Sequence, residues 1–226
     1  MVILGVDTSG REGSVALAQG DGGSFEVLEV VALTGGSYSS QLVPAVAAML
    51  EHHGLNKGSL QGFAVASGPG SFTGLRVGLS AVKGFAEVLG GRIASVSVLE
   101  ALAAAASHAD GSVVSAVDAA RKEVFVGEYK VVGGRAKCIR EALMTQLDFA
   151  QYMENHPGAQ LITPDEDIAE LARFHLKVMQ ADRPRADEYA RLGLLKILAG
   201  EVVSIEDLDA NYIRRSDAEI FSKPSF

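Results

Sequence analysis

The chain has 226 residues, of which 48% are hydrophobic and 6% aromatic, and it contains no Trp. A chain of this length buries a substantial core, which must be built mainly from Val, Leu, Ile and Ala, and this favours an α/β fold. The single cysteine, Cys138, excludes an internal disulfide and a multi-cysteine zinc site. A net charge of −8 at pH 7 repels phosphate backbones, so unaided binding of nucleic acid is not expected.

The N-terminal segment has no basic start of the kind that opens a signal peptide, and its apolar run is interrupted by Asp7. It predicts a first strand. The longest apolar segment elsewhere, residues 96–106, is too short to cross the ~30 Å of a hydrocarbon core. We therefore expect a cytoplasmic protein with no membrane association.

The first half of the chain alternates apolar runs with turn residues, which predicts strands and helices in an α/β order. Ser39 is the expected cap of the first helix. His52 and His53 fall in the last turn of that helix, where we expect exposed side chains with no shared ligand face. The predicted elements are strands at 2–6, 14–18 and 25–33, a helix at 39–53, a strand at 62–67, a helix at 73–89, a strand at 93–97 and a helix at 99–107.

The second half begins as the first does, with an apolar strand that ends in Asp118, 111 residues after Asp7. Two strand-Asp-turn-strand units half a chain apart predict a duplicated fold, although chance similarity of two short segments is the alternative. The predicted lobes are residues 1–107 and 108–226, with the final segment free to pack back on the first lobe. The second lobe is predicted to contain strands at 113–118 and 123–131, a helix at 148–154, a strand at 160–163, a helix at 166–173, a strand at 177–180 and a helix at 187–199.

A glycine-rich run, SGPGSFTGLRVG at residues 67–78, lies between a predicted buried strand and a predicted helix. Glycines allow positive φ angles and the close approach of another group, and Ser71 or Thr73 is expected to cap the helix that follows. N–H groups at a helix start attract anions such as phosphate. The standard nucleotide-binding fingerprints do not fit the run. A tight strand-to-helix connection that binds no ligand is therefore the alternative to a phosphate site. The candidate nucleotide-binding residues in the run are Gly68, Gly70, Ser71 and Thr73.

The helix predicted at 73–89 is apolar over most of its circumference, so it must be covered on more than one side. The cover is either the helix at 39–53, another subunit, or both, and we expect the two helices to form a partner interface. A charge placed there, as in Leu79→Glu or Val82→Glu, is expected to block association. The expected interface residues are Leu42, Val46, Met49, Leu75, Leu79, Val82 and Phe85.

Catalytic motifs are scarce, and no catalytic or metal-binding residue is predicted. Asp7 and Asp118 each end a strand beside a turn, where a carboxylate is placed to hold a metal or a water. The alternative is that each carboxylate caps its own turn through backbone N–H groups.

Several segments resemble the bacterial TsaB (YeaZ) family, and together they span the chain. The resemblance implies an actin-like ATPase fold of two lobes, each with a mixed sheet flanked by helices. It also implies support for the transfer of a threonylcarbamoyl group to the adenosine beside the anticodon of ANN-decoding tRNAs. The segments are GVDTS at residues 5–9, the glycine-rich run with Lys83-Gly84, DAARKEVF at 118–125 and NYIR at 211–214.

The same resemblance implies partners and a site. The implied partners are the catalytic relative TsaD (Gcp, YgjD), the small ATPase TsaE and a second copy of the chain, with tRNA contacted only indirectly. Asp7 and the glycine-rich run would lie near a nucleotide site for ATP or ADP that is shared between subunits.

Departures from the family pattern point to a subunit that is not the catalyst. TsaD binds its metal through an Asn-His-Leu-Glu-Gly-His stretch, which residues 97–102, SVLEAL, replace without either histidine. The usual Gly-Asp-Gly of the second lobe is replaced by residues 163–166, and the usual His-Ser by Tyr38-Ser39. A stand-alone metallopeptidase or a sugar-kinase-like phosphotransferase is the competing interpretation.

Overall fold

The structure is a computed structural model that describes residues 1–105, 110–133, 135–174 and 177–213. The chain folds into two compact units, residues 1–101 with 183–210 and residues 102–182 with 211–226. The boundary predicted at 107/108 lies outside the described residues, as do Ser107, the predicted end of one helix, and Arg214 of the NYIR segment. The first unit therefore includes a helix from the second half of the sequence.

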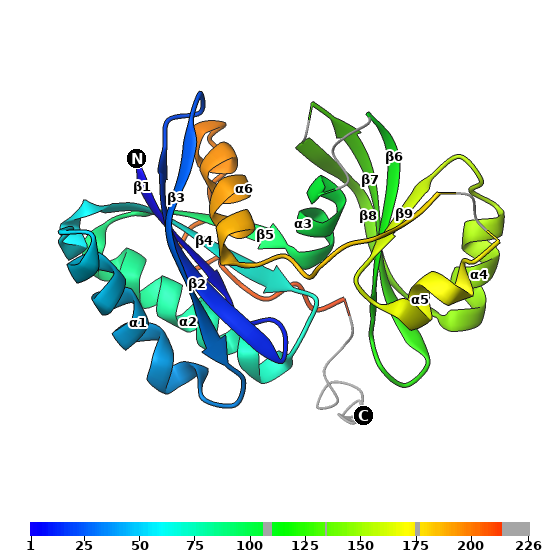
Figure 1. The fold of residues 1–226 in the computed structure, drawn as a ribbon, viewed down its shortest axis with the longest axis horizontal. Helices are drawn as coiled ribbons and strands as arrows, with labels where there is room; N and C mark the ends of the chain where they lie inside the picture. The colour runs from blue at the N-terminus through cyan, green and yellow to red at the C-terminus, as the bar shows by residue number, and fades with distance from the viewer. Residues whose placement is uncertain (106–109, 134, 175–176, 214–226) are drawn as a thin grey trace, which may run out of the picture. The chain divides into compact units, whose positions relative to one another are not determined.

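The first unit contains a five-stranded mixed sheet in the order β3-β2-β1-β4-β5 (Figure 1). The strands β1, β2 and β3 form an antiparallel meander, and β4 and β5 run parallel to β1. The central strands are buried on both faces, which explains why their sequences are nearly continuous apolar runs. The strand bounds are β1 Val2–Asp7, β2 Glu12–Gly20, β3 Phe25–Thr34, β4 Leu60–Gly68 and β5 Arg92–Ser97.

Helices cover both faces of this sheet. On one face, α1 (Tyr38–His52) and α2 (Phe72–Leu89) pack on a core that includes Leu4 and Val6 of β1. On the other face, α6 (Ala186–Leu198) packs on Ile3 of the same strand (Figure 1). Successive residues of β1 thus serve opposite cores, as the alternation of side chains along a strand requires.

The second unit repeats this topology, with its sheet in the order β10-β9-β6-β7-β8. Strands β6, β7 and β8 form the antiparallel meander, and β9 and β10 complete the sheet with parallel pairing. The shared order confirms the predicted duplication and the predicted class of fold, in which each of two lobes contains a mixed sheet flanked by helices. The bounds are β6 Gly111–Asp118, β7 Glu123–Val132, β8 Arg135–Thr145, β9 Gln160–Thr163, β10 Val178–Gln180, with helices α4 Gln146–Glu154 and α5 Glu166–Leu171. Helix α3 Val98–Ala105 and the short 3-10 turn Lys57–Ser59 complete the described elements.

Among the residues that the structure describes, β8 is the one strand that the sequence did not predict. It is an edge strand with mostly exposed or half-buried residues, so it lacks the alternation of apolar and polar residues that signals a strand. Its position was nevertheless available from the repeat, because β3 shifted by 111 residues covers 136–145. The fold of one lobe thus predicts an element of the other.

Two further points concern the helices. The N-cap of α1 is Ser37, whose side chain makes no capping hydrogen bond. The prediction that Ser39 caps this helix is therefore wrong. Among the residues that the structure describes, no helix is both long enough and apolar enough to cross a membrane.

Candidate functional site

The turn that follows β1 is organised by the carboxylate of Asp7. This side chain is buried, and its Oδ1 accepts hydrogen bonds from the backbone N–H of Ser9 (2.9 Å) and from the Ser9 hydroxyl (2.7 Å). Asp118 holds the equivalent turn of the second unit, where its Oδ1 accepts a hydrogen bond from the N–H of Ala120 over 3.1 Å. Both carboxylates therefore cap their own turns, the second of the two alternatives that the sequence offered.

Burial changes the acidity of Asp7. Desolvation raises the pKa of its carboxyl group from 3.8 to about 6, although the hydrogen bonds from Ser9 and the positive charge of Arg183 oppose the rise. Burial and the nearby charge of Asp7 also raise the pKa of the Tyr189 phenol well above its ordinary value. Arg183 and Tyr189 lie far from Asp7 in sequence, and nothing in the local sequence patterns associates them with it.

The glycine-rich run joins β4 to α2, as predicted. Gly68 has a φ angle of 110°, a conformation that favours glycine. Ser71 is the N-cap of α2, and its hydroxyl oxygen accepts a hydrogen bond from the N–H of Gly74 over 3.2 Å. The expectation that this run starts a helix with a side-chain cap is confirmed.

This run packs directly on the turn after β1. The N–H of Ser71 donates a hydrogen bond to the carbonyl oxygen of Ser9 (2.7 Å), and the hydroxyl of Thr8 donates one to the carbonyl oxygen of Gly74 (2.8 Å). A Cβ at Gly74 would lie 2.1 Å from the Thr8 carbonyl oxygen, and one at Gly70 2.3 Å from that of Ser9. The contact with the turn therefore requires these glycines, independently of any ligand.

The five residues predicted for a nucleotide site thus fall in one region of the first unit. Asp7 and Gly68 are buried within it, whereas Gly70, Ser71 and Thr73 are exposed. The exposed start of α2 is the part of this region that is accessible to a ligand.

The predicted interface residues have a different location from the one expected. Six of the seven are buried in the core of the first unit, because they form the stripes of α1 and α2 that face the sheet. The seventh, Phe85, is half-buried, and its ring stacks on Phe63 with 6.1 Å between centroids. The six buried residues are Leu42, Val46, Met49, Leu75, Leu79 and Val82.

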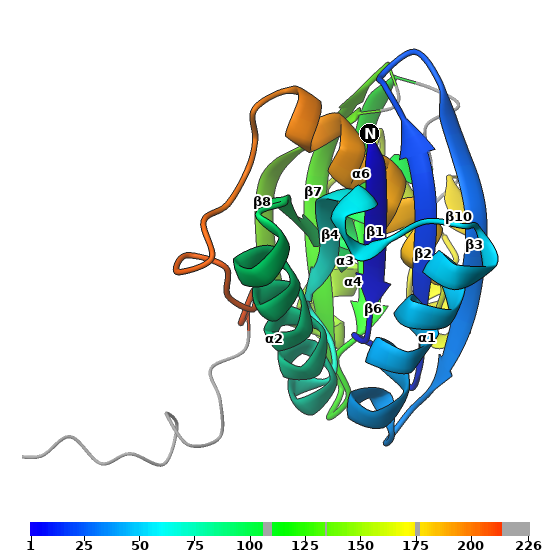
Figure 2. The ribbon, with the colours of Figure 1, turned by 90° about the vertical axis from the view of Figure 1, so that its left-hand side faces the viewer.

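Helices α1 and α2 cover the same face of the sheet (Figure 2) and contact one another. They also expose a second set of side chains. Val88 is 76% exposed, Val43 54% and Phe72 42%, and the guanidinium of Arg76 lies 3.8 Å from the centre of the Phe72 ring. We call this set the α1–α2 surface. Its members are Val43, Pro44, Ala47, Ala48, Phe72, Arg76, Ser80, Gly84, Glu87 and Val88, all of them exposed.

The segment 97–102 contains no imidazole and is largely core. Val98, Leu99 and Leu102 are buried, and their hydrocarbon side chains have no lone pair to offer a ligand. Glu100 is paired with Lys196 of α6, with 2.8 Å between the carboxylate oxygen and Nζ. The charged group of this segment is thus in an ion pair within the first unit.

Comparisons with known proteins place the chain in a family. The family described as "TsaD: tRNA N6-adenosine threonylcarbamoyltransferase" matches residues 32–186. A Bacillus subtilis protein named tRNA threonylcarbamoyladenosine biosynthesis protein TsaB is 28% identical over 97% of this chain and 96% of its own. The Escherichia coli protein of the same name is 34% identical over 58% of this chain and 55% of its own.

Solved structures show the same fold. A Pseudomonas aeruginosa protein described as similar to the peptidase YeaZ superposes with a TM-score of 0.77 at 24% identity, over 94% of this chain and 99% of that one. YeaZ from the same organism gives a TM-score of 0.75 at 24% identity, over 93% of this chain and 99% of that one. The chain belongs to the family whose description names TsaD, and within it the chain is a TsaB (YeaZ) protein, one of the proteins of tRNA threonylcarbamoyladenosine biosynthesis.

Proposed function

We propose that this chain is a non-catalytic partner subunit of a cytoplasmic complex that transfers a threonylcarbamoyl group to the adenosine next to the anticodon of ANN-decoding tRNAs. The observation that carries the proposal is the segment 97–102. In the position where the catalytic relative has an Asn-His-Leu-Glu-Gly-His stretch, this chain has buried aliphatic side chains and a glutamate paired with Lys196. A subunit built in this way contributes to the complex by association and not by metal chemistry.

Association would use the α1–α2 surface. Exposed valine, alanine and phenylalanine side chains on adjacent helices give an apolar patch of the kind that protein partners cover. The partner that this role requires is the catalytic relative TsaD, with a second copy of this chain as the competing occupant of the same surface. The small ATPase TsaE completes the proposed complex, and tRNA is contacted through the partners.

The nucleotide of this complex, ATP or ADP, would lie near the exposed start of α2. Gly70, Ser71 and Thr73 are exposed there, at a helix N-terminus that favours an anion. The buried Asp7 supports the same region, because it holds the turn whose Ser9 carbonyl oxygen accepts a hydrogen bond from Ser71. The buried Gly68 supplies the positive φ angle at the end of β4. Titration of ATP and ADP into the isolated chain and into the complex tests whether the site needs both subunits.

Reconstitution of tRNA modification tests the role itself. Purified TsaD, TsaE and the enzyme that supplies the threonylcarbamoyl donor are incubated with an ANN-decoding tRNA, with and without this chain. We expect modification only when this chain is present, and modification that proceeds unchanged without it would overturn the proposal.

Variants of the α1–α2 surface test the mode of association. Val43→Glu and Val88→Glu should abolish co-purification with TsaD while the isolated chain stays folded, because both side chains are exposed and their replacement leaves the core intact. Val132→Glu is the matched control, since Val132 is 56% exposed but belongs to β7 in the other unit. Equal effects of all three substitutions would contradict the assignment of this surface.

The competing function is a stand-alone enzyme, either a metallopeptidase or a sugar-kinase-like phosphotransferase. A kinase needs a base near its acceptor and phosphate loops in both lobes. The sequence has only one glycine-rich run of this kind, in the first lobe, which argues against a kinase. Hydrolysis of peptides, or phosphate transfer to a sugar, by the purified chain alone would favour this alternative.

A further inference from the structure

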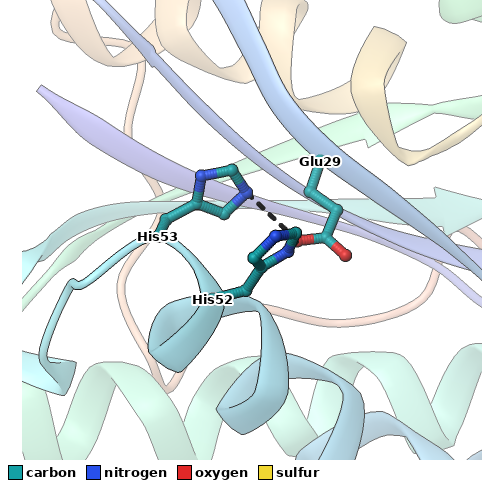
Figure 3. Close-up of polar contacts among 3 residues, drawn as sticks. All are labelled: Glu29, His52 and His53. Atoms are coloured by element: carbon teal, nitrogen blue, oxygen red, sulfur yellow. Dashed lines mark hydrogen bonds and ion pairs between the residues drawn. The ribbon is translucent and has the colours of Figure 1, made fainter.

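Two neighbouring histidines and a glutamate meet on the outer side of the first unit, away from the glycine-rich run. Nδ1 of His52 lies 3.0 Å from Oε2 of Glu29, and Nε2 of His53 lies 3.1 Å from the same oxygen (Figure 3). Each of the three side chains offers a ligand atom, and these atoms lie within 4.8 Å of one another. The sequence had suggested that the adjacent histidines share no ligand face, and the structure corrects this.

The reason for the correction is the way in which α1 ends. His52 is the last residue of the helix and His53 is its C-cap, so the chain leaves the helical path between the two side chains. Adjacent residues within a helix point about 100° apart, but this restriction ends at the cap. Both rings therefore turn toward β3, where their centroids lie 4.9 Å apart.

The backbone at this helix end is well fixed. The N–H of Leu55 donates a hydrogen bond to the carbonyl oxygen of Leu50 (2.8 Å), and the N–H of Gly54 donates one to that of Glu51 (3.0 Å). Gly54 has a φ angle of 63°, so the three features make a Schellman motif. Leu50 belongs to the core of the unit and the half-buried Leu55 packs against it, which anchors the motif beneath the histidines. The backbone that carries the two imidazoles is thus fixed by contacts within the unit.

Glu29 is held in place by the sheet. It lies in β3, paired with Leu17 of β2, on the edge of the sheet that α1 covers. Its side chain is 28% exposed and that of His53 is 25% exposed, while His52 is 74% exposed. A cation bound here would be partly shielded on the protein side and open to solvent on the other.

The spacing and chemistry of these atoms suit a transition metal. In a tetrahedral zinc site with metal–ligand distances of about 2.0–2.1 Å, neighbouring ligand atoms are about 3.3 Å apart. The two nitrogen–oxygen distances of 3.0 and 3.1 Å are close to this distance between ligand atoms. Two imidazoles and one carboxylate favour Zn²⁺ and related divalent metals over Mg²⁺ or Ca²⁺, which prefer oxygen ligands alone.

From this geometry we infer that Glu29, His52 and His53 form a binding site for Zn²⁺ or a similar divalent transition metal, which joins the end of α1 to the edge strand β3. Nδ1 of His52, Nε2 of His53 and a carboxylate oxygen of Glu29 supply three ligands. The fourth position of the tetrahedron faces solvent, where water or a side chain of another molecule completes the coordination. This site is separate from the region of Asp7 and the glycine-rich run, and it does not depend on the proposed function.

Zinc titration of the untagged, full-length chain tests the site. Isothermal titration calorimetry with Zn²⁺ should show one ion per chain, and the visible spectrum of the Co²⁺-loaded chain should show the intense bands of a tetrahedral centre. Loss of an outer-shell partner already costs about 10–100-fold in metal affinity, so removing a direct ligand should cost at least about tenfold. We expect this loss for Glu29→Gln, His52→Gln and His53→Gln.

His156→Gln is the matched control. His156 belongs to the second unit, where its Nδ1 lies 2.7 Å from the carbonyl oxygen of Tyr152, and its replacement should leave the affinity for Zn²⁺ unchanged. Nitrogen chemical shifts of the imidazoles provide a second readout, with zinc-dependent changes expected at Nδ1 of His52 and Nε2 of His53. Absence of Zn²⁺ binding, or affinity that is equal in the wild type and in Glu29→Gln, would overturn the inference.

Discussion

The carbonyl oxygen of Ala186, at the start of α6, lies so close to Gly5 of β1 that a Cβ on residue 5 would be 2.0 Å from it. The backbone of a helix from the second half of the chain thus rests on the backbone of the first strand. The same helix approaches β4, where a Cβ on Gly193 would lie 2.2 Å from Cβ of Ala64. Close packing of α6 on the first sheet therefore depends on the absence of side chains at the points of contact.

Gly5→Ala should destabilise the protein by about 3 kcal/mol or more, because the clash is with backbone atoms that cannot rotate away. Urea denaturation measures this free energy of unfolding. Gly84→Ala is the control: Gly84 lies within α2 with no atom near its absent Cβ, and alanine there should stabilise the helix by about 1 kcal/mol. If both substitutions changed the free energy of unfolding in the same direction, the packing argument for α6 would fail.

Ser14→Ala tests the capping of α6 by a side chain from the sheet. The Ser14 hydroxyl oxygen accepts a hydrogen bond from the N–H of Ala186 over 2.9 Å in a buried position, while Arg185, the N-cap of α6, makes no side-chain cap. Loss of the hydroxyl leaves a buried N–H without this acceptor and should cost about 1–2 kcal/mol. Ser39→Ala, at the exposed residue that the sequence suggested as a cap, should change the free energy of unfolding by less than about 0.5 kcal/mol.

The acidity of Asp7 gives a pH dependence of stability. Its pKa is raised to about 6 in the folded chain, so between its ordinary value of 3.8 and 6 the folded state keeps a proton that the unfolded state loses. The contribution of Asp7 to the free energy of unfolding is fully present below pH 3.8 and is lost as the pH rises through about 6. The total loss is about 3 kcal/mol.

Asp7→Asn should remove that part of the pH dependence, because the amide oxygen still accepts the hydrogen bonds from Ser9 but carries no charge. Urea denaturation of the wild type and the variant across this pH range measures the effect. The variant should gain stability relative to the wild type as the pH rises, and parallel profiles would contradict the assignment.

Leu79→Glu separates the core of α2 from its outer surface. Leu79 is buried among the residues that face the sheet, so a carboxylate there should unfold the first unit, at a cost of several kcal/mol. Val88→Glu, on the exposed side of the same helix, should leave the melting temperature within a few degrees of the wild type. Circular dichroism during heating distinguishes the two, and a Leu79→Glu chain as stable as the wild type would show that this stripe is not core.

Much of the fold follows from local sequence patterns. The apolar strand that ends in Asp7, and its repeat at Asp118, predict a duplicated α/β fold because an apolar run followed by turn residues has few other structures available to it. The glycine-rich run predicts a strand-to-helix connection capped by Ser71 or Thr73, and in the structure the cap is Ser71. Local patterns did not predict strand β8 because an exposed edge strand lacks an apolar face, although the repeat implies this strand.

Only the tertiary structure decided the relations between residues that are far apart in the chain. An apolar stripe on α2 is equally suited to a core and to a partner, and only packing on the sheet assigns Leu79 to the core and Val88 to the surface. The pKa of Asp7 depends on burial beneath elements that lie more than a hundred residues away, and the meeting of Glu29 with His52 and His53 depends on where α1 ends against β3. Sequence patterns record the preferences of neighbouring residues, whereas contacts of this kind arise from the free energy of packing the whole unit, which no local segment contains.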